Sequence, residues 1–152
     1  MGREARQETP QDGEEESLTD QELLNQALSA MRNAYAPYSG FAVGACLLAT
    51  DGRVFTGCNV ENASFGLTIC AERAALCKAV SEGAKTFTAI AIAARGAAPY
   101  PCGACRQVLH EFGPGMRVLV TWDEHTDQTT LDALLPHGFG PDALLGGKGE
   151  GA

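Results

Sequence analysis

The chain has 152 residues, 45% of them hydrophobic, which suits a single globular domain with a core of ordinary size. Its formal net charge is −8, and its eleven lysines and arginines are scattered along the sequence. Because proteins that bind a nucleic acid polymer normally present a basic face to the phosphates, this charge argues against such a partner and favours a small ligand.

No segment approaches the roughly 18 consecutive apolar residues that a membrane span requires. The N-terminus also lacks the apolar core of a signal peptide, so we expect a cytoplasmic protein with no membrane partner. In a reducing compartment, the six cysteines are expected to be metal ligands or small buried side chains rather than disulfides.

The first ordered element is expected just after an acidic N-terminal tail. Residues 1–17 are charged and poor in apolar groups, which predicts disorder. Thr19 and Glu22 are spaced as a capping box, and apolar residues then recur at helical intervals until near Tyr35. The ordered domain is therefore expected to begin with a helix at about residue 18.

A hairpin is expected next. Residues 41–49 and 54–60 are apolar, β-favouring runs, and Asp51-Gly52 between them is a good tight-turn pair. Asn59 and Glu61 fall at the end of the second run, two residues apart, so their side chains are expected to point the same way.

The remaining chain alternates helices and strands. The pattern predicts helices near 70–82, 101–112 and 131–135, strands near 86–94 and 117–122, and a polar turn between 122 and 131. This order predicts one α/β domain over residues 18–145, with a mixed sheet between helices, followed by a flexible Gly-rich tail at 146–152.

Three cysteines have the spacing of a metal site. Cys102 and Cys105 are three apart at one expected helix start, and Cys70 opens another expected helix. Helix N-termini favour thiolates, and three thiolates supply three corners of a zinc tetrahedron. Cys77 and His110 lie too far along their helices to share the ion. One open position is typical of a catalytic rather than a structural zinc site.

Glu72 follows Cys70 by two residues, so its carboxylate can lie beside the metal without binding it. There it can take a proton from a water and deliver it to a substrate nitrogen. Arg73 is a candidate donor to the thiolates, which would partly restore the Lewis acidity of the metal.

Two other interpretations of the cysteines stay open. The pair Cys102 and Cys105 alone would also suit a thioredoxin-like redox site. A structural zinc site would need Cys46 or Cys58 as its fourth ligand. For Cys46, Cys58 and Cys77, the ordinary expectation is a small side chain in the core.

Together these motifs strongly resemble the small homotetrameric cytidine deaminases over residues 18–145. The matching segments are YSGFAVGA (38–45), GCNVENA (57–63), CAER (70–73), PCGACRQ (101–107), LLP (134–136) and FGP (139–141). The resemblance implies a three-layer α/β/α sandwich with a mixed central sheet of about five strands. It also implies one Zn²⁺ per subunit and shared active sites in a homotetramer.

The resemblance further implies a reaction, in which zinc-bound hydroxide attacks C4 of cytosine and Glu72 shuttles the protons. Cytidine and 2′-deoxycytidine would become uridine and 2′-deoxyuridine, as in pyrimidine salvage. The zinc ligands would be Cys70, Cys102 and Cys105.

The resemblance also assigns the substrate contacts. Asn59 and Glu61 would hold the ribose 3′-hydroxyl, Phe41 and Ala71 would contact the nucleoside, and Phe139 would stack on the base from a neighbouring subunit. Arg73, supported by Gln107, would donate to the zinc thiolates. Phe65 departs from the family pattern, in which tyrosine is common at this position.

Two rival functions remain. A deaminase of a cytosine nucleoside antibiotic such as blasticidin S would use a similar zinc site, although Asn59-x-Glu61 and Phe139-Gly140-Pro141 favour a plain nucleoside. Outside enzymes, the rival is a zinc-stabilised binding module. The expected activity is therefore the hydrolytic deamination of a free cytosine nucleoside.

Overall fold

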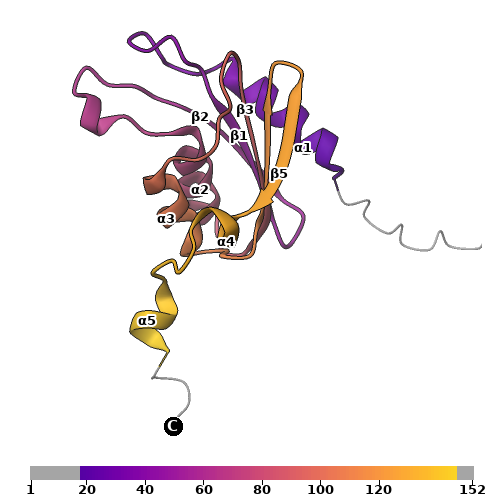
Figure 1. Cartoon of the computed structure of the whole chain (residues 1–152), viewed down its shortest axis with the longest axis vertical. Coiled ribbons are helices and arrows are strands. Elements are labelled where there is room, and N and C mark those ends of the chain that lie inside the picture. The colour runs from indigo at the N-terminus through magenta and orange to yellow at the C-terminus, as the bar shows by residue number, and fades with distance from the viewer. Residues whose placement is uncertain (1–17, 147–152) are drawn as a thin grey trace, which may run out of the picture.

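The structure is a computed structural model that describes residues 18–146 (Figure 1). The tails expected at 1–17 and beyond residue 146 lie outside the described residues. The helices are α1 (Asp20–Met31), α2 (Ala71–Ser81), α3 (Gly103–His110), α4 (Leu131–Leu134) and α5 (Pro141–Leu145), with a 3₁₀ turn η1 (Phe65–Leu67). The strands are β1 (Gly44–Ala49), β2 (Val54–Cys58), β3 (Phe87–Ala94), β4 (Arg117–Trp122) and β5 (His125–Thr130).

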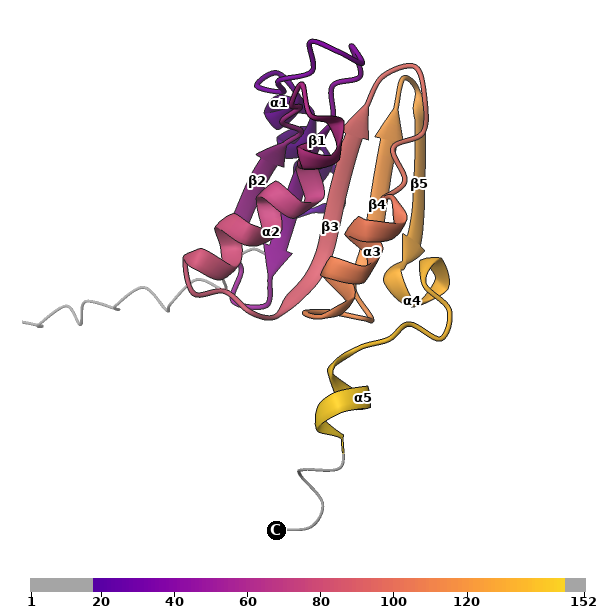
Figure 2. The ribbon, with the colours of Figure 1, turned by 90° about the vertical axis from the view of Figure 1, so that its left-hand side faces the viewer.

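The five strands form one mixed sheet in the order β2-β1-β3-β4-β5. Only β3 and β4 run parallel, joined by a crossover through α3, and the other neighbours pair antiparallel. Figure 2 shows α2 and α3 in front of the sheet and α1 behind it. The core is divided accordingly: α1 packs on Cys46, Leu48 and Leu119, whereas α2 and α3 pack on Leu47, Ile90 and Val118 among others. The three-layer α/β/α sandwich is thus confirmed.

Local chemistry explains where the first helix begins and ends. Thr19 and Glu22 form the predicted capping box, with Thr19 N–H donating to the Glu22 carboxylate at 2.7 Å. The helix ends at Met31, earlier than predicted, because the chain beyond it joins the sheet region. Tyr35 N–H donates to the Asn59 carbonyl at 2.9 Å, and its own carbonyl accepts from Glu61 N–H at 2.8 Å.

The polar turn predicted between 122 and 131 is wrong, because this segment contains strand β5. It pairs with β4 from Arg117 opposite Thr130 to Trp122 opposite His125. β5 is an edge strand whose side chains are almost all exposed, so it carries no apolar alternation. The irregular segment expected from residue 136 is likewise followed by α5, which Figure 1 shows projecting away from the sandwich.

Strand β2 and helix α2 approach each other unusually closely at Gly57. A Cβ atom there would lie 2.5 Å from the Ala75 nitrogen and 2.6 Å from the Ala71 oxygen. Gly57 therefore lets α2 lie against the strand and fixes where the first turn of that helix stands.

None of the helices in the described part of the chain has the length and apolar character that crossing a membrane requires.

Candidate active site

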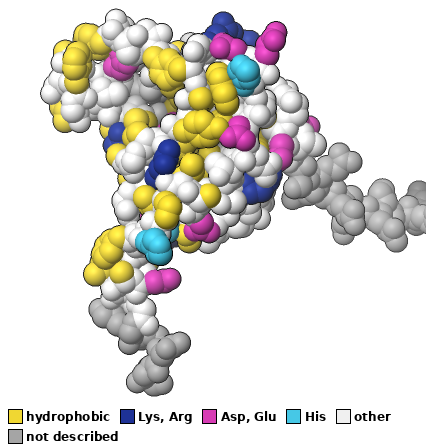
Figure 3. Space-filling model, viewed as in Figure 1, with side chains coloured by type: hydrophobic (Ala, Val, Ile, Leu, Met, Phe, Trp, Pro, Cys, Tyr) yellow, Lys and Arg dark blue, Asp and Glu magenta, His cyan; other side chains and the backbone are white. Residues whose placement is uncertain are grey.

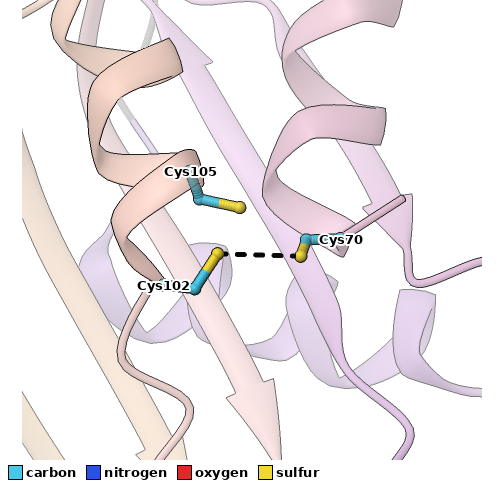
Figure 4. A group of neighbouring side chains, drawn as sticks. All are labelled: Cys70, Cys102 and Cys105. Atoms are coloured by element: carbon cyan, nitrogen blue, oxygen red, sulfur yellow. Dashed lines mark hydrogen bonds between the residues drawn. The ribbon is translucent and has the colours of Figure 1, made fainter. Parts of the chain in front are cut away.

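The three predicted metal ligands come together at the starts of two helices (Figure 4). Cys70 is the N-cap of α2, Cys102 is the N-cap of α3, and Cys105 lies in the first turn of α3. Their sulfurs all lie within 4.8 Å of one another, and those of Cys70 and Cys102 are 3.9 Å apart. A tetrahedral zinc with Zn–S bonds of about 2.3 Å places its sulfurs about 3.8 Å apart. The donor set and its spacing therefore fit zinc.

Electrostatics at this cluster favour a thiolate at Cys70. The pKa of Cys70 is lowered to about 5, chiefly by a hydrogen bond with Cys105 and then by its contacts with Arg73 and Cys102, against the effect of burial. Arg73 Nη2 donates to the Cys70 sulfur at 3.5 Å, and this contact raises the pKa of the guanidinium further. The pKa of Cys105 is raised, because it donates to Cys70 and is buried. The positive charge of Arg73 thus stands beside the Cys70 sulfur.

The other cysteines do not join this cluster. Within residues 18–146, no other group of three or more His, Cys, Asp or Glu side chains is placed to hold a metal. Cys46 is buried on the α1 side of the sheet, as expected for a core residue, and Cys58 is half-buried at the end of β2. Cys77 is exposed, so its predicted place in the core is wrong. Neither Cys46 nor Cys58 serves as the fourth ligand that a closed structural site would need.

Glu72 is buried beside the cysteines, with 4% of its surface exposed. Burial raises the pKa of its carboxyl, and a hydrogen bond with the Cys105 thiol acts in the opposite direction. The side chain stands in the first turn of α2, two residues after the N-cap. It is a carboxyl group held among the sulfurs and away from bulk water.

A cavity of about 260 Å³ opens onto these groups. It brings four residues predicted to contact a substrate together with Cys70, Glu72 and Cys102; the four are Phe41, Asn59, Glu61 and Ala71. Six lining residues were not singled out from the sequence: Ser39, Val43, Thr68, Ala98, Pro99 and Tyr100. The size suits a small molecule.

Asn59 is buried and uses its amide to hold the backbone around Phe41. Its Oδ1 accepts from Val43 N–H at 2.9 Å, and its Nδ2 donates to the Phe41 carbonyl at 2.8 Å. One N–H of the amide remains free of these two contacts. Asn59 therefore shapes the cavity wall as well as lining it.

Glu61 accepts three hydrogen bonds from the neighbouring loop. Its Oε1 accepts from Tyr38 N–H at 3.0 Å and Ser39 N–H at 3.1 Å, and its Oε2 accepts from the Ser39 hydroxyl. These bonds, that of the Ser39 hydroxyl first, lower the pKa of the Glu61 carboxyl. Glu61 is thus an ionised acceptor fixed at the cavity.

Phe139 does not line the cavity of its own chain, and 60% of its surface is exposed. Gln107 Nε2 donates to the Phe139 carbonyl at 2.7 Å, so the predicted support of Arg73 by Gln107 stays a prediction. The glycines on either side of Phe139 lie close against His110. A Cβ atom added at Gly138 would lie 3.0 Å from the His110 ring, and one added at Gly140 would lie 2.9 Å from it. The segment that carries Phe139 is therefore fastened to α3.

Phe65, the position that departs from the family pattern, is 74% exposed in η1. Its ring packs against Tyr38 at 5.7 Å between centroids. Together with Ser39, Glu61 and Thr68, these two rings line a second cavity next to the first.

Comparisons with known proteins agree with this geometry. The family model for the cytidine and deoxycytidylate deaminase zinc-binding region matches residues 17–121. A cytidine deaminase of Sporosarcina psychrophila is 46% identical over 127 residues, covering 82% of this chain and 93% of that protein. One from Mycobacterium tuberculosis is 49% identical over 123 residues, covering 80% and 90% of the two chains.

Among solved structures, the crystal structure of cytidine deaminase from Burkholderia pseudomallei is similar over 80% of this chain and 100% of that one. The TM-score is 0.77 and the sequence identity is 46%. The matched zinc-binding region contains all three clustered cysteines. The chain therefore belongs to the cytidine and deoxycytidylate deaminase family of zinc-binding enzymes.

Proposed function

We propose that the chain catalyses the hydrolytic deamination of free cytidine and 2′-deoxycytidine to uridine and 2′-deoxyuridine. The observation that carries the proposal is a buried carboxyl group, Glu72, beside three clustered cysteine sulfurs in a cavity of nucleoside size. The names of the relatives support the substrate class, since they are cytidine deaminases.

In this proposal, Cys70, Cys102 and Cys105 hold zinc, which when bound supplies an activated water as the nucleophile for C4 of cytosine. Glu72 accepts one proton of that water and donates it to N3 of the ring. It then passes the second proton, from the hydroxyl now bonded to C4, to the amino group, so that the C4–N bond breaks, ammonia leaves and C4 becomes a carbonyl. Because Glu72 is buried, the protons it carries pass between the water and the nucleoside and do not exchange with solvent.

The other lining residues position the nucleoside. Glu61, an ionised acceptor, takes a hydrogen bond from the ribose 3′-hydroxyl, and the free N–H of Asn59 donates to the same group. Ala71 offers a backbone N–H at the start of α2, where helix N–H groups lack partners within the helix. Phe41 packs against the sugar from the segment that Asn59 holds.

The complete site also needs a second copy of the chain, in a homotetramer with shared active sites. Phe139 is exposed and lies outside its own cavity, which suits a side chain that enters a neighbour's cavity. Exposed apolar side chains around η1 provide surface for such contact, namely Tyr35, Tyr38, Val60, Phe65, Leu67 and Ile69. The free cysteines support a reducing, cytoplasmic setting, in keeping with a role in pyrimidine salvage.

The first experiment replaces Glu72 with alanine and measures ammonia release from cytidine and deoxycytidine. We expect Glu72→Ala to keep its zinc and its fold while losing activity by orders of magnitude, whereas Glu82→Ala, an exposed position at the end of α2, stays fully active. A fully active Glu72→Ala variant would contradict the assignment. Turnover of blasticidin S alone would identify an antibiotic deaminase, and function without zinc would favour the redox pair.

The second experiment tests the shared site by complementation. Glu72→Ala and Phe139→Ala chains, each impaired alone, are expected to regain activity when assembled together, because a mixed oligomer contains sites with both native residues. An active monomer in gel filtration would exclude a contribution from a neighbouring chain.

A further inference from the structure

One wall of the substrate cavity is formed by a segment that no catalytic role uses. Ala98, Pro99 and Tyr100 line the cavity and lead directly to Cys102. They belong to the connection between β3 and α3, in which Pro99 and Pro101 are buried. The position of this wall therefore affects both the substrate and the approach to a metal ligand.

The wall is fastened to the β4–β5 hairpin at two points. Gly96 N–H donates to the Asp123 carboxylate at 3.0 Å, and the Tyr100 hydroxyl donates to the Asp127 carboxylate on β5. The ring of Tyr100 also packs against Trp122, with 6.1 Å between centroids. The metal-ligand cysteines lie at the starts of α2 and α3 and not on this hairpin. The hairpin nevertheless holds the segment that leads to Cys102.

The bond between Tyr100 and Asp127 has a defined direction. The Tyr100 hydroxyl is the donor, because the carboxylate of Asp127 offers only acceptor oxygens. A carboxylate acceptor also makes the bond charge-assisted, which is stronger than a neutral hydrogen bond. The contact can therefore hold the wall even though both residues are exposed to solvent.

We propose that Tyr100, held by Asp127 and Trp122, is a positioning residue that fixes the cavity wall and thereby limits substituents at C5 of the cytosine ring. The inference rests on the proposed function. With C4 between Cys70 and Cys102, the N3 side of the base faces Glu72 at the start of α2. In this binding mode the C5 side of the ring points away from Glu72, and we assign it to Ala98, Pro99 and Tyr100, which line the same cavity next to Cys102.

The test compares cytidine with 5-methylcytidine in purified zinc-loaded enzyme. Tyr100→Phe removes only the hydroxyl and keeps the ring on Trp122, while Asp127→Ala removes the acceptor. Gln128→Ala is the matched control, because it is exposed on the same strand and its side chain makes no hydrogen bond among the described residues.

For Tyr100→Phe and Asp127→Ala, we expect the KM for cytidine to rise about three- to tenfold, the size of one net hydrogen bond, with kcat and zinc content little changed. The ratio of kcat/KM for 5-methylcytidine to that for cytidine should rise in both variants. The double variant should match Asp127→Ala, which already breaks the bond to Tyr100 as well as the bond that Asp127 accepts from Gln128 N–H.

An unchanged substrate ratio, or additive effects in the double variant, would overturn the inference while leaving cytidine deamination intact. A general loss of stability would lower the activity toward both substrates equally and would also overturn it. Wild-type enzyme inactive on cytidine would instead overturn the proposed function, and this inference with it.

Discussion

Replacing Gly57 with alanine should displace helix α2 and, with it, the metal ligand Cys70 and the neighbouring Glu72. The added Cβ atom would lie 2.5 Å from the Ala75 nitrogen and 2.6 Å from the Ala71 oxygen, whereas ordinary contact begins near 3.4 Å. Both atoms belong to the helix backbone, so no side chain can rotate away. Strand and helix must therefore separate by about 0.9 Å to bring the shorter contact to that distance.

Two consequences follow from this separation. Overpacking of a core contact costs about 1–3 kcal/mol, and a backbone clash belongs at the upper end, which lowers Tm by about 6–12 °C for a domain of this size. Ala71 also adjoins Cys70 and Glu72, so both groups move relative to Cys102 and Cys105. A misplacement near 1 Å can reduce a catalytic rate about a hundredfold.

The assay combines thermal unfolding followed by circular dichroism, zinc content and the rate of cytidine deamination. Gly115→Ala is the control, because its added Cβ atom would have no neighbour closer than the Asp132 carboxylate at 3.9 Å, an ordinary contact. We expect the control to match the wild type and the Gly57 variant to lose stability and activity together. A Gly57→Ala protein that melts within about 2 °C of the wild type and keeps its rate would refute the role of this close approach.

Three further outcomes are expected. Because hydrogen bonds lower the pKa of Glu61, its carboxylate stays ionised as the pH falls, so the wild-type KM should change little between about pH 7 and 5. Ser39→Ala removes the largest of these contributions. As the pH falls, the KM of the variant should therefore begin to rise at a higher pH than the KM of the wild type; parallel pH profiles would contradict this. Gly140→Ala should push the Phe139 segment off His110, raising KM with little change in Tm, and His110→Ala in the same chain should partly restore KM. Removing zinc with a chelator should abolish deamination, and adding zinc back should restore it; activity that survives the chelator would contradict the metal assignment.

The metal centre was predictable because its determinants are local in the sequence. The spacing of Cys102 and Cys105 within one helical turn, and the place of Cys70 at a helix start, follow from the chain alone. That the two helix starts meet could be inferred only from chemistry, since three thiolates suggest a shared ion. The structure shows where the two helix starts meet, with the sulfurs of Cys70 and Cys102 3.9 Å apart.

The cavity wall was not predictable, because it depends on a strand without a strand pattern. β5 is polar and exposed, so only its pairing with β4 identifies it, and Asp127 gains its partner Tyr100 through that pairing. Cys77 was assigned to the core by residue type. Its helical phase, beside exposed Lys78 and apart from the buried face of Ala75 and Ala79, would have placed it on the surface.

The charges of the site explain why it is built on two helix starts. Three cysteine sulfurs and the buried carboxyl group of Glu72 meet in one cluster, and as thiolates the sulfurs would repel one another and the carboxylate, which opposes both folding and the approach of a nucleophile. Helix N-termini at Cys70 and Cys102 direct positive ends of two dipoles at the sulfurs, and Arg73 adds a full positive charge at 3.5 Å from Cys70. Because both Cys70 and Arg73 depend on the placement of α2, a shift of that helix weakens the ligand and its compensating charge together. The packing of α2 on the sheet is therefore part of the catalytic apparatus, because Ala71, which lies against Gly57 in that contact, also lines the substrate cavity.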